Sequence, residues 1–331
     1  SSALRNSIRP RLADLGLQLN TVLLSHGEPN QSPKLTYSYT SLSSDKLVIS
    51  DDAAKSIGRA FPIAKPVFTY LANDIRAAGK PSGIPFSMVA GIDLDSNAKT
   101  PKSFQFQPLS AVTGKIISQP ADDQIVLNQW AAEDLEIEIG DKIVVTFFEP
   151  ESTHGSQEQR SVEFTVADIA AVTTPESPFG YNRRDGVTPP TYSKAPTVAN
   201  DPDLTPIVPG VTDAESIEDW DLPFATADKI RGQDDTYWEN FRTTPKAFIN
   251  LAVAQKLFSS RFGNTTSFRI PTSAGTNIDL EKKLTAQFSD DGVQLGLNLV
   301  PIKRRGLAAS SGSTPFDVLF LALSMFVIGS A

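Results

Sequence analysis

Cysteine is absent from all 331 residues, and histidine occurs only twice. The absence of cysteine excludes disulfides, thiol catalysis and cysteine-based zinc sites. His26 and His154 each precede a glycine in a loop-like stretch, so we expect both to be surface residues rather than catalytic bases. A G-x-S-x-G nucleophile elbow is missing as well, so the chain lacks the usual sequence signature of an α/β-hydrolase.

Nucleotide-binding motifs are also missing. The sequence has neither G-x-x-x-x-G-K-[ST] nor G-x-G-x-x-G, so we expect that the chain itself does not hold the phosphates of ATP. Its net charge is −8, which argues against a nucleic-acid partner, because phosphate binding needs concentrated lysine and arginine. We expect no cofactor, no metal site and no enzymatic activity of its own.

Carboxylates gather at one place in the sequence. The cluster consists of Asp213, Glu215, Glu218, Asp219 and Asp221. Paired carboxylates serve glycosidases and calcium sites, but charges of this density are also typical of a solvated helix face, which we favour here. A second stretch, DLDSN (93–97), begins like a calcium loop. Ala98 and Phe104, however, stand where such a loop needs glycine and glutamate.

Aromatic residues are concentrated in DDTYWENF (234–241). Tyr237, Trp238 and Phe241 fall at helical spacing within it. Such a cluster is typical of a packed core, and it also carries the hypothesis of an interaction surface or ligand site.

Apolar periodicity and capping residues predict helices and strands that alternate along the chain. The predicted helices cover 1–20, 51–61, 128–135, 250–263 and 277–288, and Thr212 with Glu215 has the spacing of a further capping box. The predicted strands cover 65–77, 84–94, 142–149, 161–172, 266–271 and 292–300. Two segments, VLNQWAAEDL (126–135) and FINLAVAQKL (248–257), repeat one plan in which an asparagine caps a helix that follows a strand.

This order of elements predicts an α+β fold, in which mixed short strands and helices include a small β-rich subdomain and precede the start of a transmembrane helix. Eight prolines fall within 173–210, which we interpret as a loop or linker. The predicted divisions are a first domain part over 1–172, this loop over 173–210, a second part over 211–304, a linker over 305–314 and a membrane segment over 315–331.

The segment 315–331 is apolar all round a predicted helix. Its apolar positions, with the proline that starts the helix, are Pro315, Phe316, Val318, Leu319, Phe320, Leu321, Leu323, Met325, Phe326, Val327 and Ile328. Such a helix is about 25 Å long, whereas the hydrocarbon core of a bilayer is ~30 Å thick. We interpret the segment as the truncated start of a transmembrane helix in a fragment of a longer protein. The alternative is a buried C-terminal helix of a soluble protein.

Several segments, taken in order, resemble the FtsX-like permeases of bacterial ABC transporters that carry a MacB-like extracytoplasmic domain. The segments are TYLAN (69–73), IVLNQWAAEDL (125–135), GDKIVVTFFEPES (140–152), GVTDAESIEDWDLPF (211–224), DDTYWENFRTTPKAFINLAVAQKLFSSRFGNTTSFRI (234–270) and RGLAASSGSTPFDVLFLALSMF (305–326). The resemblance runs over most of residues 69–331, and none of its motifs is catalytic.

The resemblance implies a transport component that does no chemistry itself. In such permeases the domain lies on the periplasmic side of the bacterial inner membrane, and a separate cytoplasmic ABC ATPase subunit hydrolyses ATP. The implied partners are that ATPase subunit, through the full permease, the lipid bilayer, and an envelope protein, lipoprotein or exported substrate. Two other functions stay open: a membrane-anchored binding or adhesion module, and a secreted hydrolase that uses the 213–221 carboxylates or His154.

Overall fold

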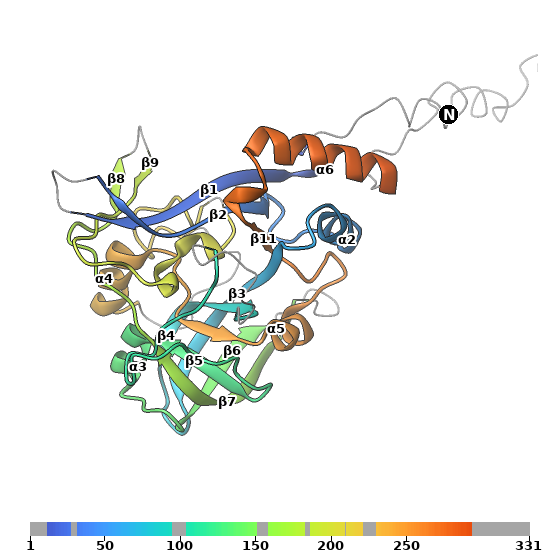
Figure 1. Ribbon diagram of the computed structural model, residues 1–331. Helices are drawn as coiled ribbons and strands as arrows, with labels where there is room; N and C mark the ends of the chain where they lie inside the picture. The colour runs from blue at the N-terminus through green and yellow to red at the C-terminus, as the bar shows by residue number, and fades with distance from the viewer. Residues whose placement is uncertain are drawn as a thin grey trace, which may run out of the picture. The chain divides into compact units, whose positions relative to one another are not determined.

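The described part of the chain consists of residues 12–27, 32–94, 104–150, 158–182, 186–208, 210–220 and 230–292 of a computed structural model. The chain divides into two units, residues 1–293 and 294–331, and the second unit lies outside the described residues. All the elements that follow belong to the first unit, which Figure 1 shows as a coloured ribbon.

Strands hold more of the described residues than helices do. The strands are β1 (Leu17–His26), β2 (Lys34–Ser44), β3 (Lys65–Ala77), β4 (Ile84–Ile92), β5 (Gln124–Asn128), β6 (Lys142–Phe148), β7 (Gln159–Ala170), β8 (Gly180–Asn182), β9 (Gly186–Thr188), β10 (Ala247–Ile249) and β11 (Ser267–Ile270). The α-helices are α2 (Asp51–Ala60), α3 (Gln129–Leu135), α4 (Gly232–Phe241), α5 (Leu251–Phe258) and α6 (Asn277–Asp291). Short 3-10 helices are η1 (Ala13–Leu15), η3 (Val198–Asn200), η4 (Pro202–Leu204) and η5 (Thr272–Ala274).

Six of the strands form a closed barrel. Around it the order is β3, β4, β10, β5, β7 and β6, and β6 pairs with β3 to close the ring. The pairs β4–β10 and β5–β7 are parallel, and the other four pairs are antiparallel. A closed ring leaves no edge strand, so the backbone groups of its strands find their partners within the barrel.

The long strand β3 belongs to the barrel and to an open extension of the same sheet. Its first residues, 65–67, pair with β11, and its last residues, 74–77, pair with β6. β11 pairs with β2, and β2 pairs with β1 over ten residue positions. Valine, phenylalanine, threonine, tyrosine and isoleucine in β3 favour the extended backbone that this double role needs.

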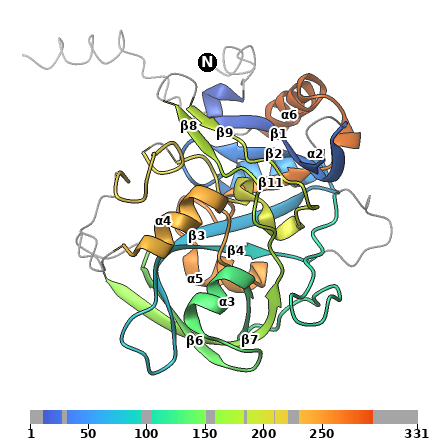
Figure 2. The ribbon, with the colours of Figure 1, turned by 90° about the vertical axis from the view of Figure 1, so that its left-hand side faces the viewer.

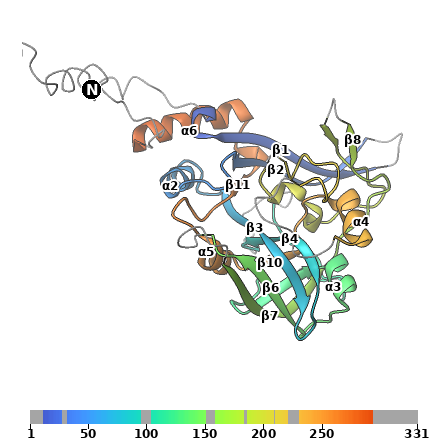
Figure 3. The ribbon, with the colours of Figure 1, turned by 180° about the vertical axis from the view of Figure 1, so that it is seen from behind.

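The main hydrophobic core lies along the barrel strands and under two helices. Its buried strand residues are Phe68, Ala72, Ile75, Val89, Ile125, Leu127, Ile143, Val145, Phe147, Phe164, Val166, Ile169, Ala247 and Ile249. Figure 1 and Figure 3 both place α3 and α5 on opposite sides of these strands. Helix α5 packs so closely that a Cβ added at Gly91 of β4 would lie 2.1 Å from the Cβ of Ala254, so this position requires glycine.

Helices α2 and α6 pack against each other and against the extension formed by β1, β2 and β11 (Figure 2). The buried residues they share with it include Leu42, Ile57, Phe268, Ile270, Leu280, Leu284 and Phe288. Ser50 caps α2, because its hydroxyl accepts a hydrogen bond from the backbone N–H of Ala53. Thr276 and Asp279 form a capping box at the start of α6. Both helices are therefore confirmed where the sequence predicted them.

The predicted α+β fold of short alternating elements is wrong. The described residues form a mixed α/β domain in which a single nine-stranded sheet closes partly into a barrel. Its strands are not uniformly short, since β3 has 13 residues and β7 has 12. The spacing of apolar residues along the chain indicates only which side of a helix or strand faces inward. The closure depends on pairing between β3 and β6, which are distant in sequence, so the local pattern did not contain it.

Other predicted elements fare unequally. The helices after Asn128 and Asn250 are confirmed, although α5 ends at Phe258 rather than at Gly263. The predicted helix over 1–20 is wrong in its described part, where β1 already begins at Leu17. The Thr212 capping box is wrong too. Residues 210–220 form turns, and the Thr212 hydroxyl is hydrogen-bonded to the backbone of Val208 instead.

The proline-rich segment 173–210 holds β8, β9, η3 and η4 and buries Ala199, Asn200 and Leu204 against the domain. Within the described ranges, no helix combines the length and the apolar character that crossing a membrane requires. The membrane helix predicted at 315–331 and the strand residues 293–300 lie outside those ranges.

Candidate functional site

Helix α4 carries the aromatic residues that the sequence singled out, and it turns all three inward. Tyr237, Trp238 and Phe241 are each at most 4% exposed. Trp238 directly follows Tyr237, and Phe241 comes three residues after Trp238 and four after Tyr237, which places them on one side of the helix. The structure thus brings them together as a buried cluster, and two of them line a pocket.

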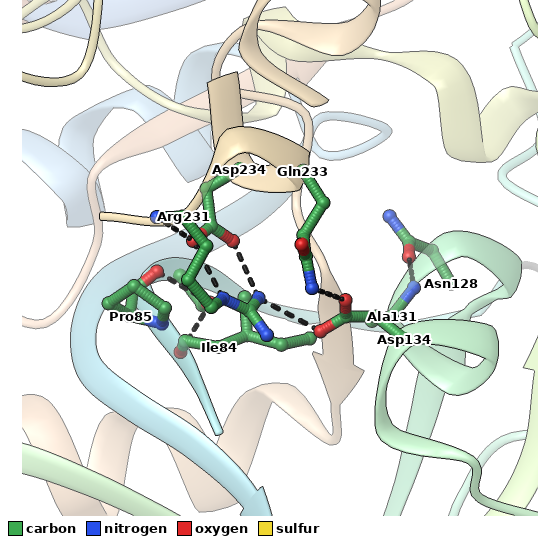
Figure 4. A network of polar contacts seen from close by, with 9 residues as sticks. Ile84, Pro85, Asn128, Ala131, Asp134, Arg231, Gln233 and Asp234 are labelled. Carbon is green, nitrogen blue, oxygen red and sulfur yellow. Dashed lines mark hydrogen bonds and ion pairs between the residues drawn. The ribbon is translucent and has the colours of Figure 1, made fainter. Parts of the chain in front are cut away.

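An arginine at the start of α4 ties this helix to α3 (Figure 4). The Arg231 guanidinium donates hydrogen bonds to Asp234 in its own helix, at 2.7 and 2.9 Å, and to Asp134 in α3, at 2.9 Å. Gln233 donates to the other oxygen of Asp134 at 2.9 Å. The hydrogen bonds to Asp234, followed by those to Asp134, raise the pKa of Arg231 although partial burial opposes the shift. Both carboxylates are therefore engaged by Arg231.

The pocket lies between α4, β4 and the segments that flank them; we call it the aromatic pocket. Its apolar walls are Phe86, Met88, Ile217, Trp220, Tyr237 and Trp238. Its polar lining consists of Arg242, Thr243, Thr244 and Lys246. The empty space is about 240 Å³ when counted out to the open mouth, and its inner part admits a group about the size of one water molecule.

Lys246 is the most unusual residue of the aromatic pocket, because its side chain is only 3% exposed. Its Nζ atom lies 4.7 Å from the ring centroid of Tyr237 and 5.2 Å from that of Trp130. Burial lowers the pKa of the ammonium to about 8, although the charges of Asp234 and Asp134 partly oppose that shift. The two rings replace some of the lost hydration through cation–π attraction.

Tyr237 is held in place by a chain of buried hydrogen bonds. Its hydroxyl accepts from Nδ2 of Asn128 at 2.9 Å and donates to the backbone oxygen of Thr244 at 2.8 Å. The same amide nitrogen donates to the oxygen of Pro245 at 3.1 Å. These bonds fix the two residues before Lys246, whose own backbone N–H donates to Met88 and whose carbonyl accepts from Asn128, so the lysine extends from a rigid segment.

Arg242 follows α4 directly and has a strained backbone. Its φ and ψ are 49° and −128°, outside the regions that a long side chain normally adopts. Nη1 donates to the backbone oxygen of Ala214 at 2.7 Å, and the guanidinium lies 4.9 Å from the ring centroid of Trp238. Burial lowers the pKa of Arg242. Phe86, which also lines the aromatic pocket, has a positive φ as well, of 44°.

The remaining predicted site residues do not converge on this pocket. His26 lies in β1, where its ring nitrogen is hydrogen-bonded to Thr36. Asp213, Glu215, Glu218 and Asp219 are exposed on the turns between 210 and 220. His154, Asp221, residues 95–97 of the DLDSN stretch and the segment 315–331 lie outside the described residues. Where the structure describes the chain, no three acidic or histidine side chains are grouped closely enough to hold a metal ion.

A second buried polar group lies near η4. Asp201 is fully buried, and one of its oxygens accepts from the backbone N–H of Asp203 at 3.0 Å. The hydroxyl of the buried Tyr39 lies close enough to the Asp201 carboxyl to act on it, and this contact partly opposes the rise in the pKa of Asp201. Burial, followed by the charge of Asp203, raises the pKa of Asp201 to about 8. Asp201 is therefore mostly protonated at neutral pH.

Sequence patterns had not singled out Lys246, Arg242 or Trp220. The one local signal is that Lys246 stands at the start of the apolar run AFI, where a charged residue has little access to water. Arg242 and Trp220 belong to turns whose neighbours in space come from other segments, and no spacing rule joins them to Lys246.

We compared the chain with protein families, with curated proteins and with solved structures. No family model matches the sequence, and no curated protein matches it. One similar solved structure is a domain of a protein from Porphyromonas gingivalis that is provisionally named a permease. The alignment covers 86% of this chain and 84% of that chain, with 6% sequence identity and a TM-score of 0.34. The likeness is thus to a permease-associated domain, and at this TM-score it carries no argument for the function of the present chain.

Proposed function

We propose that this chain supplies the extracytoplasmic domain of an FtsX-like ABC-transporter permease. The observation that carries the proposal is where the permease-like segments fall. TYLAN belongs to β3, IVLNQWAAEDL to β5 and α3, and the long segment 234–270 runs through α4, β10, α5 and β11. These elements build much of the barrel and one wall of the aromatic pocket. Most of the resembling segments that the structure describes therefore fall on the barrel and its helices, whereas residues 211–220 form turns.

In this proposal the domain binds and moves but does no chemistry. A cytoplasmic ABC ATPase subunit hydrolyses ATP, the membrane part of the permease transmits the motion, and the domain acts on an envelope protein, lipoprotein or exported substrate on the periplasmic side. A domain built on a closed barrel suits this task, because a closed sheet resists deformation and passes a displacement on as a whole.

The complete gene tests the proposal. We expect several further hydrophobic segments of about 20 residues after the position of Ala331, and a neighbouring gene that encodes an ATPase with G-x-x-x-x-G-K-[ST]. The full-length tagged protein, extracted in detergent, should bind that ATPase, and it should no longer bind the ATPase when the segments after Ala331 are removed.

A membrane-anchored binding module is the second candidate, and the aromatic pocket favours it as a feature built for holding a ligand. It predicts one hydrophobic segment, then a short basic tail, and no associated ATPase. That result would contradict the permease proposal and leave the pocket as the main functional feature.

A further inference from the structure

Within the described residues, β1 is the one strand of the nine-stranded sheet that has a neighbour on a single side. Each of the other eight strands pairs with at least two strands, because the barrel is closed and β3, β11 and β2 continue the sheet into the extension. The side of β1 that faces away from β2 is therefore the free edge of the sheet.

The hydrogen bonds at the start of β1 show which backbone groups face this edge. The carbonyl of Gly16 points toward β2, because it accepts from the N–H of Asp45, directly after β2, at 2.8 Å. The N–H of Leu17 belongs to the same trans peptide and points the opposite way. It donates to the carbonyl of Leu12 at 2.8 Å. The backbone of Leu17 therefore faces the free edge.

The direction of the backbone groups alternates from one residue of a strand to the next. The N–H and C=O groups of Leu19, Thr21 and Leu23 therefore also face the free edge, as far as the register shift after Leu24. No described residue makes a hydrogen bond with the backbone of these three on that side. Each presents one donor and one acceptor, and such a row is what an added strand pairs with.

β1 also lacks the features by which proteins usually protect a free edge. Natural edge strands are short or carry lysine, proline or an inward-pointing charge. β1 has 10 residues, and Leu17 to Ser25 include neither a proline nor a charged residue. On this strand Thr21 is exposed and Leu23 is 61% exposed. The edge is thus suited to pairing with another strand.

We propose that β1 pairs with β1 of a second copy of this chain, antiparallel about a two-fold axis at Thr21. In this register Thr21 lies opposite Thr21 of the second copy, and Leu19 of each copy lies opposite Leu23 of the other. Each such pair exchanges two hydrogen bonds, so the three pairs form about six. Threonine pairs across strands are favourable, and the leucine pairs bury apolar surface that is exposed in the single chain.

A second copy fits this edge because β1 is self-complementary. A leucine lies two residues before Thr21 and another lies two residues after it, so the strand presents the same pattern in both directions. A charged residue in such a strand would lie near its like in the other copy, which is unfavourable, and β1 has none from Leu17 to Ser25. The net charge of −8 on each copy opposes association over a longer range, and salt screens it.

This inference goes beyond the proposed function and does not depend on it, because it holds for a permease domain and for an anchored binding module alike. One strand pair is a small interface, so we expect a weak dimer with a Kd on the order of 10–100 µM. Analytical ultracentrifugation of the purified 331-residue chain should show a monomer–dimer equilibrium between about 5 and 500 µM. Raising the salt concentration from about 20 to about 200 mM should lower the Kd several-fold.

Variants at the edge separate this dimer from association through any other surface. Thr21→Pro removes an N–H that faces the free edge and is not used by the β1–β2 ladder, and it should abolish the dimer. Thr21→Val keeps this donor and should dimerise like the parent chain. Leu23→Lys adds a charge to the edge and should also give monomers. Val112→Lys, at a residue that is 63% exposed and lies outside β1, should leave the Kd unchanged. Circular dichroism confirms that each variant is folded.

The absence of cysteine from the chain allows a test of the register. Thr21→Cys should form an intermolecular disulfide rapidly, because the Cα atoms of such a pair are about 5.5 Å apart, a distance that a disulfide spans. Leu23→Cys should cross-link far more slowly, because its two Cα atoms would be separated by more than about 13 Å across the axis. The proposal is overturned if the parent chain stays monomeric up to about 500 µM, if Thr21→Pro leaves a dimer intact, or if Leu23→Cys cross-links as fast as Thr21→Cys.

Discussion

A lysine that is 3% exposed and lies against two aromatic rings has lost most of its hydration. Cation–π attraction returns about 2 kcal/mol at best, which is less than the effective penalty of several kcal/mol for a buried ion. Lys246 is therefore expected to lower the stability of the unliganded fold. The charges of Asp234 and Asp134 offset part of this cost, since they favour the charged form of the lysine.

Replacing Lys246 by methionine should therefore stabilise the unliganded protein. At pH 7 we expect the free energy of unfolding to rise by about 1–3 kcal/mol, because an apolar side chain of similar volume replaces a buried charge. The folded-state pKa of about 8 lies below the ordinary value for lysine. Between about pH 8 and 10.5 the unfolded chain binds more protons than the folded one, so the parent protein gains stability as pH rises and the advantage of the variant shrinks.

Urea unfolding of both proteins between pH 7 and 10.5 measures this effect. Lys142→Met, at an exposed lysine, should leave the stability nearly unchanged. A loss of stability in Lys246→Met at pH 7 would mean that the ammonium makes a favourable interaction that outweighs its burial.

Asp201 supplies the opposite pH dependence. Its folded-state pKa of about 8 lies above the ordinary value for aspartate, so between about pH 4 and 8 the folded state keeps a proton that the unfolded state has released. Stability contributed by this group is present below pH 4 and is lost as pH rises to 8. Asp201→Asn keeps the acceptor for the Asp203 N–H and removes the charge. We expect the variant to match the parent near pH 4 and to exceed it by roughly 1–3 kcal/mol at pH 8.

Chemical denaturation at several pH values, with the carbon-13 shift of the Asp201 carboxyl as a second readout, tests this expectation. Parallel stability curves for the parent and Asp201→Asn would show that Asp201 titrates alike in the folded and unfolded chains.

At the scale of elements, the two strand–asparagine–helix units are neighbours in the barrel. β5 pairs antiparallel with β10, and each strand leads through an asparagine into a helix. Asn128 accepts from the N–H of Ala131 at 2.8 Å, and Asn250 accepts from that of Ala252 at 2.9 Å. The sequence was sufficient to predict both caps, because capping depends on residues one turn apart.

The two caps should nevertheless differ in strength. Asn250→Ala removes one capping bond and should cost about 1 kcal/mol. Asn128→Ala also removes the buried amide N–H groups that donate to the Tyr237 hydroxyl and to the Pro245 oxygen. We therefore expect this variant to lose roughly 2–4 kcal/mol of unfolding free energy. Thermal and urea unfolding of the matched pair gives the comparison. Equal losses would show that the buried bonds of Asn128 contribute little.

The element scale also shows where sequence reasoning ends at the pocket. Helical spacing correctly placed Tyr237, Trp238 and Phe241 on one side of α4, and their aromatic character predicted a packed cluster. Lys246 joins that cluster from the residue before β10, and Trp220 joins it from the end of the turns at 210–220. Those contacts depend on how distant strands pair to close the barrel. A short stretch of sequence does not contain that information.

At the scale of the whole molecule, the barrel and its helices are fitted closely enough that one methyl group matters. Gly91→Ala would place a Cβ 2.1 Å from Ala254, so α5 must move away from β4, and we expect a loss of about 2–4 kcal/mol. Gly58 in α2 has open space around an added Cβ. The same substitution there should stabilise the protein by about 0.5–1 kcal/mol, through the helical preference of alanine.

Unfolding measurements on the two variants test this pair. If Gly91→Ala were as stable as the parent, α5 would not be packed on β4 as closely as the structure has it. If Gly58→Ala lost stability, the open side of α2 would be covered by some other segment.

The double role of β3 has a mechanical meaning for the molecule. A strand of 13 residues is about 43 Å long, and no loop interrupts it where it passes from the barrel to the extension beside β11. β3 is therefore one continuous strand shared by the barrel and the extension, and it contains no hinge between them. A force applied to β1 and β2 should therefore be transmitted to the barrel through β3. The barrel and the extension should unfold in one transition rather than one after the other.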